Sequence, residues 1–398
     1  MTRTHIEMLP PHPLRPGYDR SAERGSLHDD FQQRLEPANF NTTYFDTLAQ
    51  RLQNAADHAP ADQDLCYMLA FVLLQNNADT AAVARAAALL AGTTTARGRR
   101  LLDLIDGITT RASAHRPVNP TVKRVNWSIN NRCPMSCTGC YNPFVTDQIT
   151  YEQALSIVDK LAAHGTTDLV LAGGDPLLWP PIFDVIDYAT SSGISVALDT
   201  TGYTLTADKL QRLAPLSSLR LPLDGTTPAV QRAFRHSPDR DLPTRFQQSL
   251  HLCDDAGFHK VRVHTVASRA NISDLAAIAD CVMSHPSVRQ WVVFQWWGRR
   301  APKSLTETMA INAESIRDEI TKIRDRYPNR EIIFAETTER AFLNWMIQSS
   351  GQVVTFGSGP EEEFIIGNLL TDEIADISRH PILDFEAMAR GVPVTPPS

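Results

Sequence analysis

The stretch RVNWSINNRCPMSCTGC, residues 124–140, decides the fold expected of this chain. Polar and apolar residues alternate over residues 124–129, which predicts a β-strand. Directly after this strand come Cys133, Cys137 and Cys140, separated by three and then two residues. Cysteine thiolates are the usual protein ligands of iron-sulfur clusters, and four of them normally complete a four-iron cube. Three thiolates therefore predict a [4Fe-4S] cluster in which one iron keeps an open position.

Two other interpretations of the three cysteines are open. A structural zinc site would need a fourth ligand, and commonly a second pair of closely spaced cysteines. No histidine lies within ten residues of the three cysteines, and the remaining ones, Cys66, Cys253 and Cys281, are isolated in the sequence. The other alternative is three unconnected buried thiols. Cys253 and Cys281 fall in helical patterns and are expected to be ordinary buried thiols.

The spacing of the three cysteines resembles that of the radical S-adenosylmethionine (SAM) enzymes. In that family the amino and carboxylate groups of SAM occupy the open iron, and an electron from the cluster cleaves SAM to a 5′-deoxyadenosyl radical. A short run, residues 168–172, ends in Gly173, Gly174, Asp175 and Pro176, which is similar to the family's GGEP motif. The resemblance implies that these residues bind the amino group of SAM. Asp175 stands where glutamate is usual, which keeps the charge but shortens the reach.

Later strand ends carry further segments that resemble the SAM pocket of the family. Asp199 and Thr200 follow a predicted strand and are similar to its TNG segment. Asp224 follows the next predicted strand and is similar to the SLDG segment of the peptide-modifying branch. Pro222 stands where that branch has a serine that contacts the ribose. Ribose binding is therefore expected to differ here, or to use Thr200 or Asp199.

Other residues have two interpretations each. Arg235 resembles the arginine that pairs with the SAM carboxylate, since a planar guanidinium suits bidentate carboxylate recognition; an exposed helix arginine is the alternative. Gly139 occupies the slot where many members place an aromatic residue against the adenine. Tyr141, nearby, is either a substitute or a core side chain. Three large side chains on later predicted strands are expected to lie in the core rather than to contact substrate: His264, Trp296 and Trp297.

Strand and helix patterns alternate six times between about residues 122 and 298. Thr150 and Gln153, for example, form a capping box at the start of a helix that Gly165 ends. Such alternation predicts a parallel sheet, and parallel barrels carry their sites on loops that follow the strands. The predicted fold class is therefore α/β, with a partial (β/α)6 TIM-like barrel, the radical SAM core, at residues 117–300.

The flanks of the barrel are expected to form three further parts. Residues 1–30 lack periodicity, which predicts a mobile tail. Residues 31–116 are rich in Ala and Leu at helical spacing, which predicts a helical N-terminal domain that gives structural support or binds a substrate or partner. Residues 301–398 are predicted to form an α+β segment, with a long helix from Ser304 to about Arg326. This segment is similar to SPASM-type radical SAM proteins but lacks the cysteines of their auxiliary clusters.

Composition and charge limit the partners and the cellular compartment expected for this chain. Lys and Arg total 38 against 45 Asp and Glu, a net charge of −7, which predicts no general nucleic-acid surface. The apolar run LCYMLAFVLL is shorter than the ~20 residues that span a membrane. The sequence opens without an apolar signal segment, and a reducible cluster needs a reducing compartment. We expect a cytoplasmic protein with an external electron donor of the flavodoxin or ferredoxin type, and with neither nucleic acid nor membrane as a partner.

The resemblance implies a radical SAM enzyme with one [4Fe-4S] cluster and SAM as its cofactors. The absence of auxiliary-cluster cysteines favours redox-neutral outcomes such as epimerisation, rearrangement or elimination, or an oxidation that returns the electron to the one cluster. We expect the substrate to be a ribosomally made peptide in natural-product biosynthesis. The alternatives are radical modification of a small sugar or nucleoside intermediate and, in another class, a non-catalytic metal-binding scaffold. The sequence predicts no residue that acts on the substrate itself.

Overall fold

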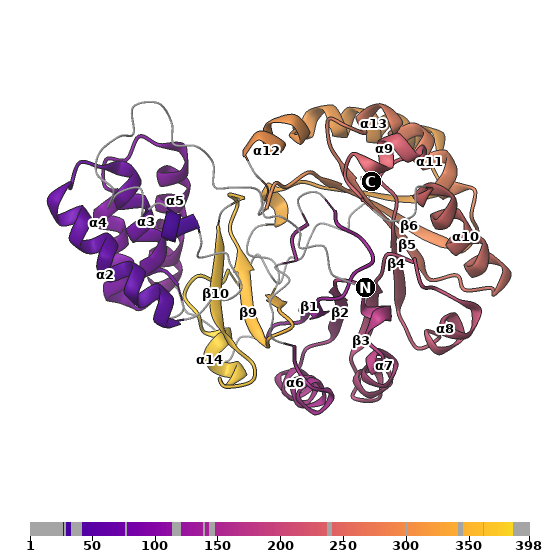
Figure 1. Cartoon of the computed structure of the whole chain (residues 1–398), viewed down its shortest axis with the longest axis horizontal. Coiled ribbons are helices and arrows are strands. Elements are labelled where there is room, and N and C mark those ends of the chain that lie inside the picture. Colours follow the sequence, from indigo (N-terminus) through magenta and orange to yellow (C-terminus); the bar gives the residue numbers. More distant parts are fainter. Residues whose placement is uncertain are drawn as a thin grey trace.

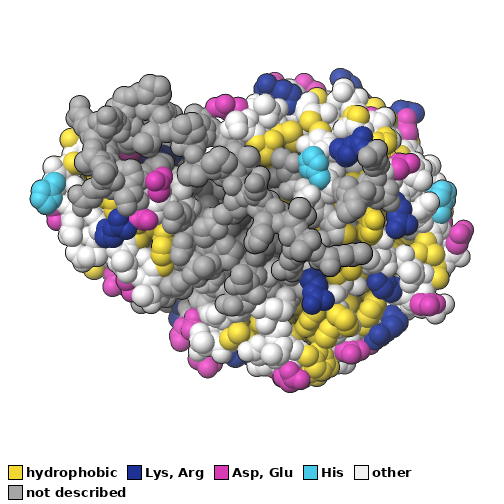
Figure 2. All heavy atoms as spheres, in the orientation of Figure 1, with side chains coloured by type: hydrophobic (Ala, Val, Ile, Leu, Met, Phe, Trp, Pro, Cys, Tyr) yellow, Lys and Arg dark blue, Asp and Glu magenta, His cyan; other side chains and the backbone are white. Residues whose placement is uncertain are grey.

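The protein is described by a computed structural model. It describes residues 27, 29–32, 42–75, 78–113, 121–137, 140–142, 148–236, 241–299, 301, 303–340, 345–360 and 362–384. A group of helices lies at one side of a strongly curved sheet, and further helices surround the outside of that sheet (Figure 1). Figure 2 shows positive and negative side chains interspersed around the rim of this face.

The described strands form one sheet: β1 (Arg124–Asn130), β2 (Asp168–Gly173), β3 (Ser195–Asp199), β4 (Ser218–Pro222), β5 (Val261–Ala267), β6 (Val288–Gln295), β7 (Glu331–Ala335), β8 (Trp345–Ile347), β9 (Gln352–Phe356) and β10 (Glu363–Asn368). Their order is β10-β9-β8-β1-β2-β3-β4-β5-β6-β7. The pairs from β8 through β1 to β7 are parallel, whereas β9 and β10 pair antiparallel. The predicted α/β fold with a parallel sheet is confirmed.

Helices connect the parallel strands and cover the outer face of the sheet (Figure 1). They are α6 (Tyr151–His164), α7 (Ile182–Ser191), α8 (Ala207–Arg212), α9 (Pro228–Arg232), α10 (Leu242–Asp255), α11 (Leu275–Met283), α12 (Lys303–Met309) and α13 (Ala313–Arg326), with 3₁₀ turns η2 (Pro176–Leu178), η3 (Ile272–Asp274) and η4 (Thr338–Arg340). The predicted capping box of Thr150 and Gln153 begins α6, and Gly165 ends it with a left-handed backbone.

The two faces of the sheet differ sharply in chemistry. Alternate residues of each strand, such as Trp127, Leu171 and Val263, are fully buried in one apolar core with residues of the outer helices. Burying each of these side chains contributes roughly 1.5–3 kcal/mol. The residues between them point the other way, because side chains alternate along a strand. On β5 these are Arg262 and His264, which stay partly accessible. The inner face of the curved sheet thus carries polar residues on β5 that lie outside the apolar core.

The N-terminal helices dock on the free edge of β10. They are α2 (Thr42–His58), α3 (Gln63–Leu73), α4 (Thr80–Leu90) and α5 (Ala96–Ser113). Phe71 stacks on Phe364 with ring centroids 4.8 Å apart. The Gln75 amide donates to the Glu363 carbonyl (3.4 Å) and accepts from the Ile365 N–H (3.0 Å). A side chain therefore takes the place of a neighbouring strand and covers an edge that would otherwise invite pairing.

The C-terminal part departs from the predicted pattern. β7 follows residue 300 yet continues the parallel sheet beside β6, and β8 joins the opposite edge beside β1. The prediction of one long helix from Ser304 to Arg326 is wrong, because α12 ends at Met309 and Asn312 caps a new helix by accepting from the Ser315 N–H (2.7 Å). Gly367 and Asn368 end β10, and the turn that follows at residues 369–371 leads into α14 (Ile374–Ser378).

The predicted mobile tail can be compared with the structure only in part. Of the predicted mobile tail, residues 1–26 and 28 lie outside the described residues, while Leu27 is buried in the apolar core. Among the described helices, none is both long and apolar enough to cross a membrane.

Candidate active site

The loop that carries the three cysteines rests directly on the end of β2. The Gly174 N–H donates to the Asn130 carbonyl (2.8 Å) and the Asp175 N–H to the Arg132 carbonyl (2.6 Å). A Cβ at Gly173 would lie 2.5 Å from the Asn130 oxygen, and one at Gly174 only 2.2 Å from the Arg132 oxygen. Gly173 also has a φ of +128°, which favours glycine. The two glycines therefore allow close packing against the end of β2 by the loop that carries Cys133, Cys137 and Cys140, called the cysteine loop below.

Asp175 organises the neighbouring strand ends. Its carboxylate is fully buried and accepts from the Leu177 N–H (3.1 Å), the Thr200 hydroxyl (2.7 Å), the Thr201 N–H (3.3 Å) and the Thr201 hydroxyl. Pro176 follows as the first residue of η2. A buried carboxylate is stable only when such donors replace its water. Asp175 thus joins β2 to the end of β3, and it engages Thr200, one of the predicted SAM ligands.

Asp224 and Arg235 form a second buried pair beside the cysteines. The Arg235 Nε donates to one oxygen of the fully buried Asp224, and the Val266 N–H donates to the other (2.6 Å). The Arg235 Nη1 lies 3.9 Å from the Cys137 Sγ. Burial lowers the pKa of Arg235, but Asp224 and Cys137 outweigh it and raise that pKa above its usual value. Arg235 is therefore a fixed cation at the thiol, rather than an exposed helix residue.

The three thiols suit a metal centre. None is in a disulfide. Burial raises the pKa of Cys133 to about 12, and it also raises the pKa of Cys137 against the opposing effect of Arg235. Thiols in such surroundings lose their protons when a metal supplies the missing positive charge. The donor set therefore fits an iron-sulfur cluster.

A compact group of possible metal ligands lies elsewhere. His251, Asp254 and His285 bring three ligand atoms within 4.8 Å of one another. A single zinc ion with bonds of about 2.3 Å requires its ligand atoms to lie this close together. The sulfurs of the three cysteines, which all belong to described residues, do not form such a compact group. Asp254 accepts from His285 Nδ1 (2.6 Å) and from the Ser287 N–H (2.8 Å), which gives these residues a structural role in joining α10 to the start of β6.

Two predicted cofactor residues face the inside of the sheet. Asp199 accepts from the Arg220 Nη1 (3.2 Å) on the neighbouring strand. Tyr141 follows the cysteine loop and is 40 % exposed. Desolvation of its hydroxyl, then Asp199 and Cys140, raise the Tyr141 pKa. Tyr141 is thus no core residue, and it lies between the cysteines and the polar inner face.

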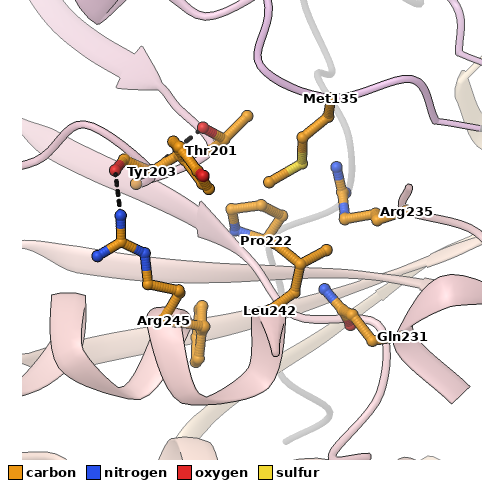
Figure 3. Close-up of a pocket in the computed structure, with 10 residues that line it drawn as sticks. Met135, Thr201, Tyr203, Pro222, Gln231, Arg235, Leu242 and Arg245 are labelled. Carbon is orange, nitrogen blue, oxygen red and sulfur yellow. Dashed lines mark hydrogen bonds between the residues drawn. The ribbon is translucent and has the colours of Figure 1, made fainter. Parts of the chain in front are cut away.

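A small cavity separates the cysteine loop from the ends of β3 and β4 (Figure 3). Met135 of the loop, Tyr203 after β3, Pro222 at the end of β4 and Arg235 line it. Arg245 donates to the Tyr203 carbonyl (3.4 Å) and its guanidinium lies over the Tyr203 ring, 4.9 Å from the ring centre. Pro222, where the resemblance leads one to expect a serine, therefore offers an apolar surface to this cavity.

A sequence profile of the radical SAM superfamily matches residues 127–282, which include the cysteine loop and the strand ends described above. The chain contains a radical SAM domain. The curated relatives that it resembles include proteins named as a synthase and a maturase. The SAM-dependent chemistry of the superfamily matches the donor set of the site.

Curated relatives of the chain are similar to it over part of their length. The AdoMet-dependent heme synthase of Methanosarcina barkeri is 25% identical over 43% of this chain and 50% of its own. The mycofactocin maturase MftC of Mycobacterium tuberculosis is 27% identical over 39% of this chain and 40% of its own. The chain thus spans half or less of the length of these relatives. Streptococcus suis SuiB bound to precursor peptide SuiA has the same fold, with a TM-score of 0.52 at 11% identity, over 74% of this chain and 70% of SuiB.

Sequence reasoning missed part of the radical SAM site. Thr201 binds Asp175 through both its N–H and its hydroxyl, and Arg220 engages Asp199. The prediction that His264 is a core residue is wrong: it lies on the inner face, edge-on to Phe294 with ring centroids 5.1 Å apart. Trp296 is buried as expected. Gly139 lies outside the described residues.

Proposed function

We propose that this radical SAM enzyme holds a single [4Fe-4S] cluster on Cys133, Cys137 and Cys140 and modifies a ribosomally made peptide. The observation that carries the proposal is the close fit of the cysteine loop on Gly174, with Arg235 beside Cys137. The loop, the glycines and the buried cation come from three separate parts of the chain, and together they make one site at the strand ends.

SAM would bind between the cysteine loop and the ends of β2 to β5. In this proposal the backbone of Gly173 and Gly174 and the ring of Pro176 would line one side of this space. Arg235 offers a guanidinium that matches a carboxylate. When bound, the cluster and SAM supply an electron and a 5′-deoxyadenosyl radical that removes a hydrogen atom from the substrate.

The chain's own acids would act by positioning in this proposal. Asp175 and Asp224 are fully buried and already accept hydrogen bonds from protein donors. Asp175 holds Thr200 and Thr201 at the end of β3, and Asp224 holds Arg235 at Cys137. Asp199 is engaged by Arg220, so ribose recognition in the proposed site would fall to other groups, such as Tyr141.

A peptide substrate is supported by two observations. SuiB, whose fold this chain shares, was solved with a precursor peptide, and the C-terminal strands β9 and β10 correspond to the segment that resembles SPASM-type proteins. The chain has no cysteine after Cys281, which supports one cluster and a redox-neutral outcome. We place the enzyme in the cytoplasm with a flavodoxin-type or ferredoxin-type electron donor. Relatives named as a heme synthase and as a nucleotide dehydratase support the alternative, a small-molecule substrate such as a sugar or nucleoside intermediate.

The test is anaerobic co-expression with peptides encoded by short open reading frames beside the gene. A mass change in one peptide, such as loss of water or deuterium uptake from solvent on epimerisation, is the expected result. The matched control is Cys137→Ala, which should leave the peptide unchanged. Unmodified peptides together with turnover of a sugar or nucleoside would overturn the peptide assignment and favour the alternative.

A further inference from the structure

A polar row crosses the inner face of the sheet on five neighbouring strands. Strand register places its members side by side, in the order Asp199, Arg220, Arg262, Gln290 and Glu331. The two ends of the row are satisfied internally. Asp199 accepts from Arg220 (3.2 Å), and Glu331 accepts from the Gln290 side-chain amide. The centre of the row is then Arg262 next to Arg220.

Arg262 makes no close ion pair, and the acids Glu331, Asp199 and Asp168 act on its charge only from a distance. Among the described residues, nothing accepts a hydrogen bond from its guanidinium or pairs with it within 4 Å. Its direct neighbour in register is another arginine, and like charges side by side on adjacent strands are destabilising. Arg220 is only 7% exposed, and its buried Nε also has no acceptor among the described residues. Two adjacent guanidinium groups thus keep donors that the protein does not satisfy.

Two more basic groups face the same place. His264 lies one step along the inner face from Arg262 on β5, and Arg124 approaches from β1. Burial, then Arg220, lower the pKa of Arg124 to about 10. Burial lowers the pKa of His264 to about 3, and Arg220, Arg262 and Arg124 contribute to that shift. The third inward acid, Asp168, accepts from the Thr167 hydroxyl (2.7 Å) at the start of β2.

Adjacent guanidinium groups that keep free N–H donors form a recognition site for an anion. We propose that Arg220, Arg262 and His264 bind an anionic group of the substrate, a carboxylate or a phosphate, within the curved sheet. This inference rests on the proposed function, because it takes the inner face as the place where substrate binds. His264 lies three residues before the end of β5, and its register neighbour on β4 is Pro222, which lines the cavity beside the cysteine loop.

The test follows the His264 imidazole by NMR in the reconstituted holoenzyme, with the signal assigned by its loss in His264→Gln. Inorganic phosphate and acetate are the two probes, titrated separately. We expect a saturable shift of the His264 signal, and the probe with the lower half-saturating concentration identifies the class of anion. Arg262→Gln should raise that concentration roughly tenfold or more, the effect of removing a charged hydrogen-bond partner.

The matched control is Arg289→Gln, which removes one positive charge from an exposed position of the same sheet beside Gln290. It should bind the probes like the wild type. Arg262→Lys guards against misfolding, since it keeps the charge and should lie between wild type and Arg262→Gln. No shift with either probe, or equal weakening in Arg262→Gln and Arg289→Gln, would overturn the anion site.

SAM cleavage without substrate separates this inference from the proposed function. The wild type and the control Arg289→Gln should both form 5′-deoxyadenosine with dithionite, because Arg289 is exposed and is not part of the proposed site. If both cleave SAM while phosphate and acetate leave His264 unmoved, the anion site is wrong and the proposed function stands. If neither cleaves SAM, the proposed function itself fails.

Discussion

Replacing Gly174 by alanine tests whether the cysteine loop can pack against the end of β2 only because Gly173 and Gly174 have no side chains. The new Cβ would lie 2.2 Å from the Arg132 carbonyl oxygen, so the loop must retreat by about 1 Å to reach an ordinary contact. That movement strains or breaks two buried hydrogen bonds, Gly174 to Asn130 (2.8 Å) and Asp175 to Arg132 (2.6 Å). At roughly 1–2 kcal/mol for each lost bond, we expect Gly174→Ala to cost about 2–4 kcal/mol of unfolding free energy.

Iron content distinguishes displacement of the cysteine loop from a general loss of folding stability. Gly193→Ala is the matched control, because Gly193 has a φ of +83° and a Cβ there meets nothing within 4 Å. Left-handed strain alone should cost that variant about 1–2 kcal/mol. After anaerobic reconstitution, Gly193→Ala should hold as much iron as wild type, and Gly174→Ala should hold little. Full iron content in Gly174→Ala, at any stability, would refute the argument that the glycine admits the loop.

Further predictions concern stability and can be checked by urea unfolding. Arg235→Met leaves the buried Asp224 carboxylate unpaired and should cost about 3–5 kcal/mol, whereas Arg235→Lys should cost less; equal losses would contradict the pairing. The His264 pKa is about 3 in the folded protein and about 6.5 when unfolded. The unfolded chain therefore binds the extra proton, so stability falls as pH drops from about 6.5 towards 3, by at most about 1.4 kcal/mol per pH unit. The unfolding free energy of His264→Gln should decline less steeply between pH 7 and 5 than that of the wild type. An unchanged slope would contradict a neutral, desolvated His264 imidazole in the folded protein. Gln75→Ala should cost about 1–3 kcal/mol, because two backbone groups of β10 lose their partner; no change would mean that water replaces the amide.

The alternation of strand and helix was sufficient to predict the parallel sheet and the placement of the motifs at its strand ends. The cysteine spacing and the GGDP segment predicted which residues meet there. β8 could not be predicted, because three residues are too few for a periodic pattern. Its position beside β1 depends on chain packing after the barrel has formed.

The partners of individual side chains were beyond the sequence for a physical reason. Alternation shows that Arg220 and Arg262 each lie on one face of a strand, but only the register between strands makes them neighbours. Thr200 and Asp199 are adjacent in the chain yet bind different partners, Asp175 and Arg220. An isolated histidine such as His264 is compatible with either face of its strand, so the sequence pattern does not show that its side chain lies on the inner face.

The most direct test of the account is 5′-deoxyadenosine formation by the anaerobically reconstituted protein with SAM and dithionite. We predict about four irons per chain and formation of 5′-deoxyadenosine, both lost in Cys133→Ala, Cys137→Ala and Cys140→Ala. Cys253→Ala and Cys281→Ala should retain both. Failure of the wild type to bind iron or to release 5′-deoxyadenosine, or their persistence in the first three variants, would contradict the assignment and favour a non-catalytic metal-binding scaffold.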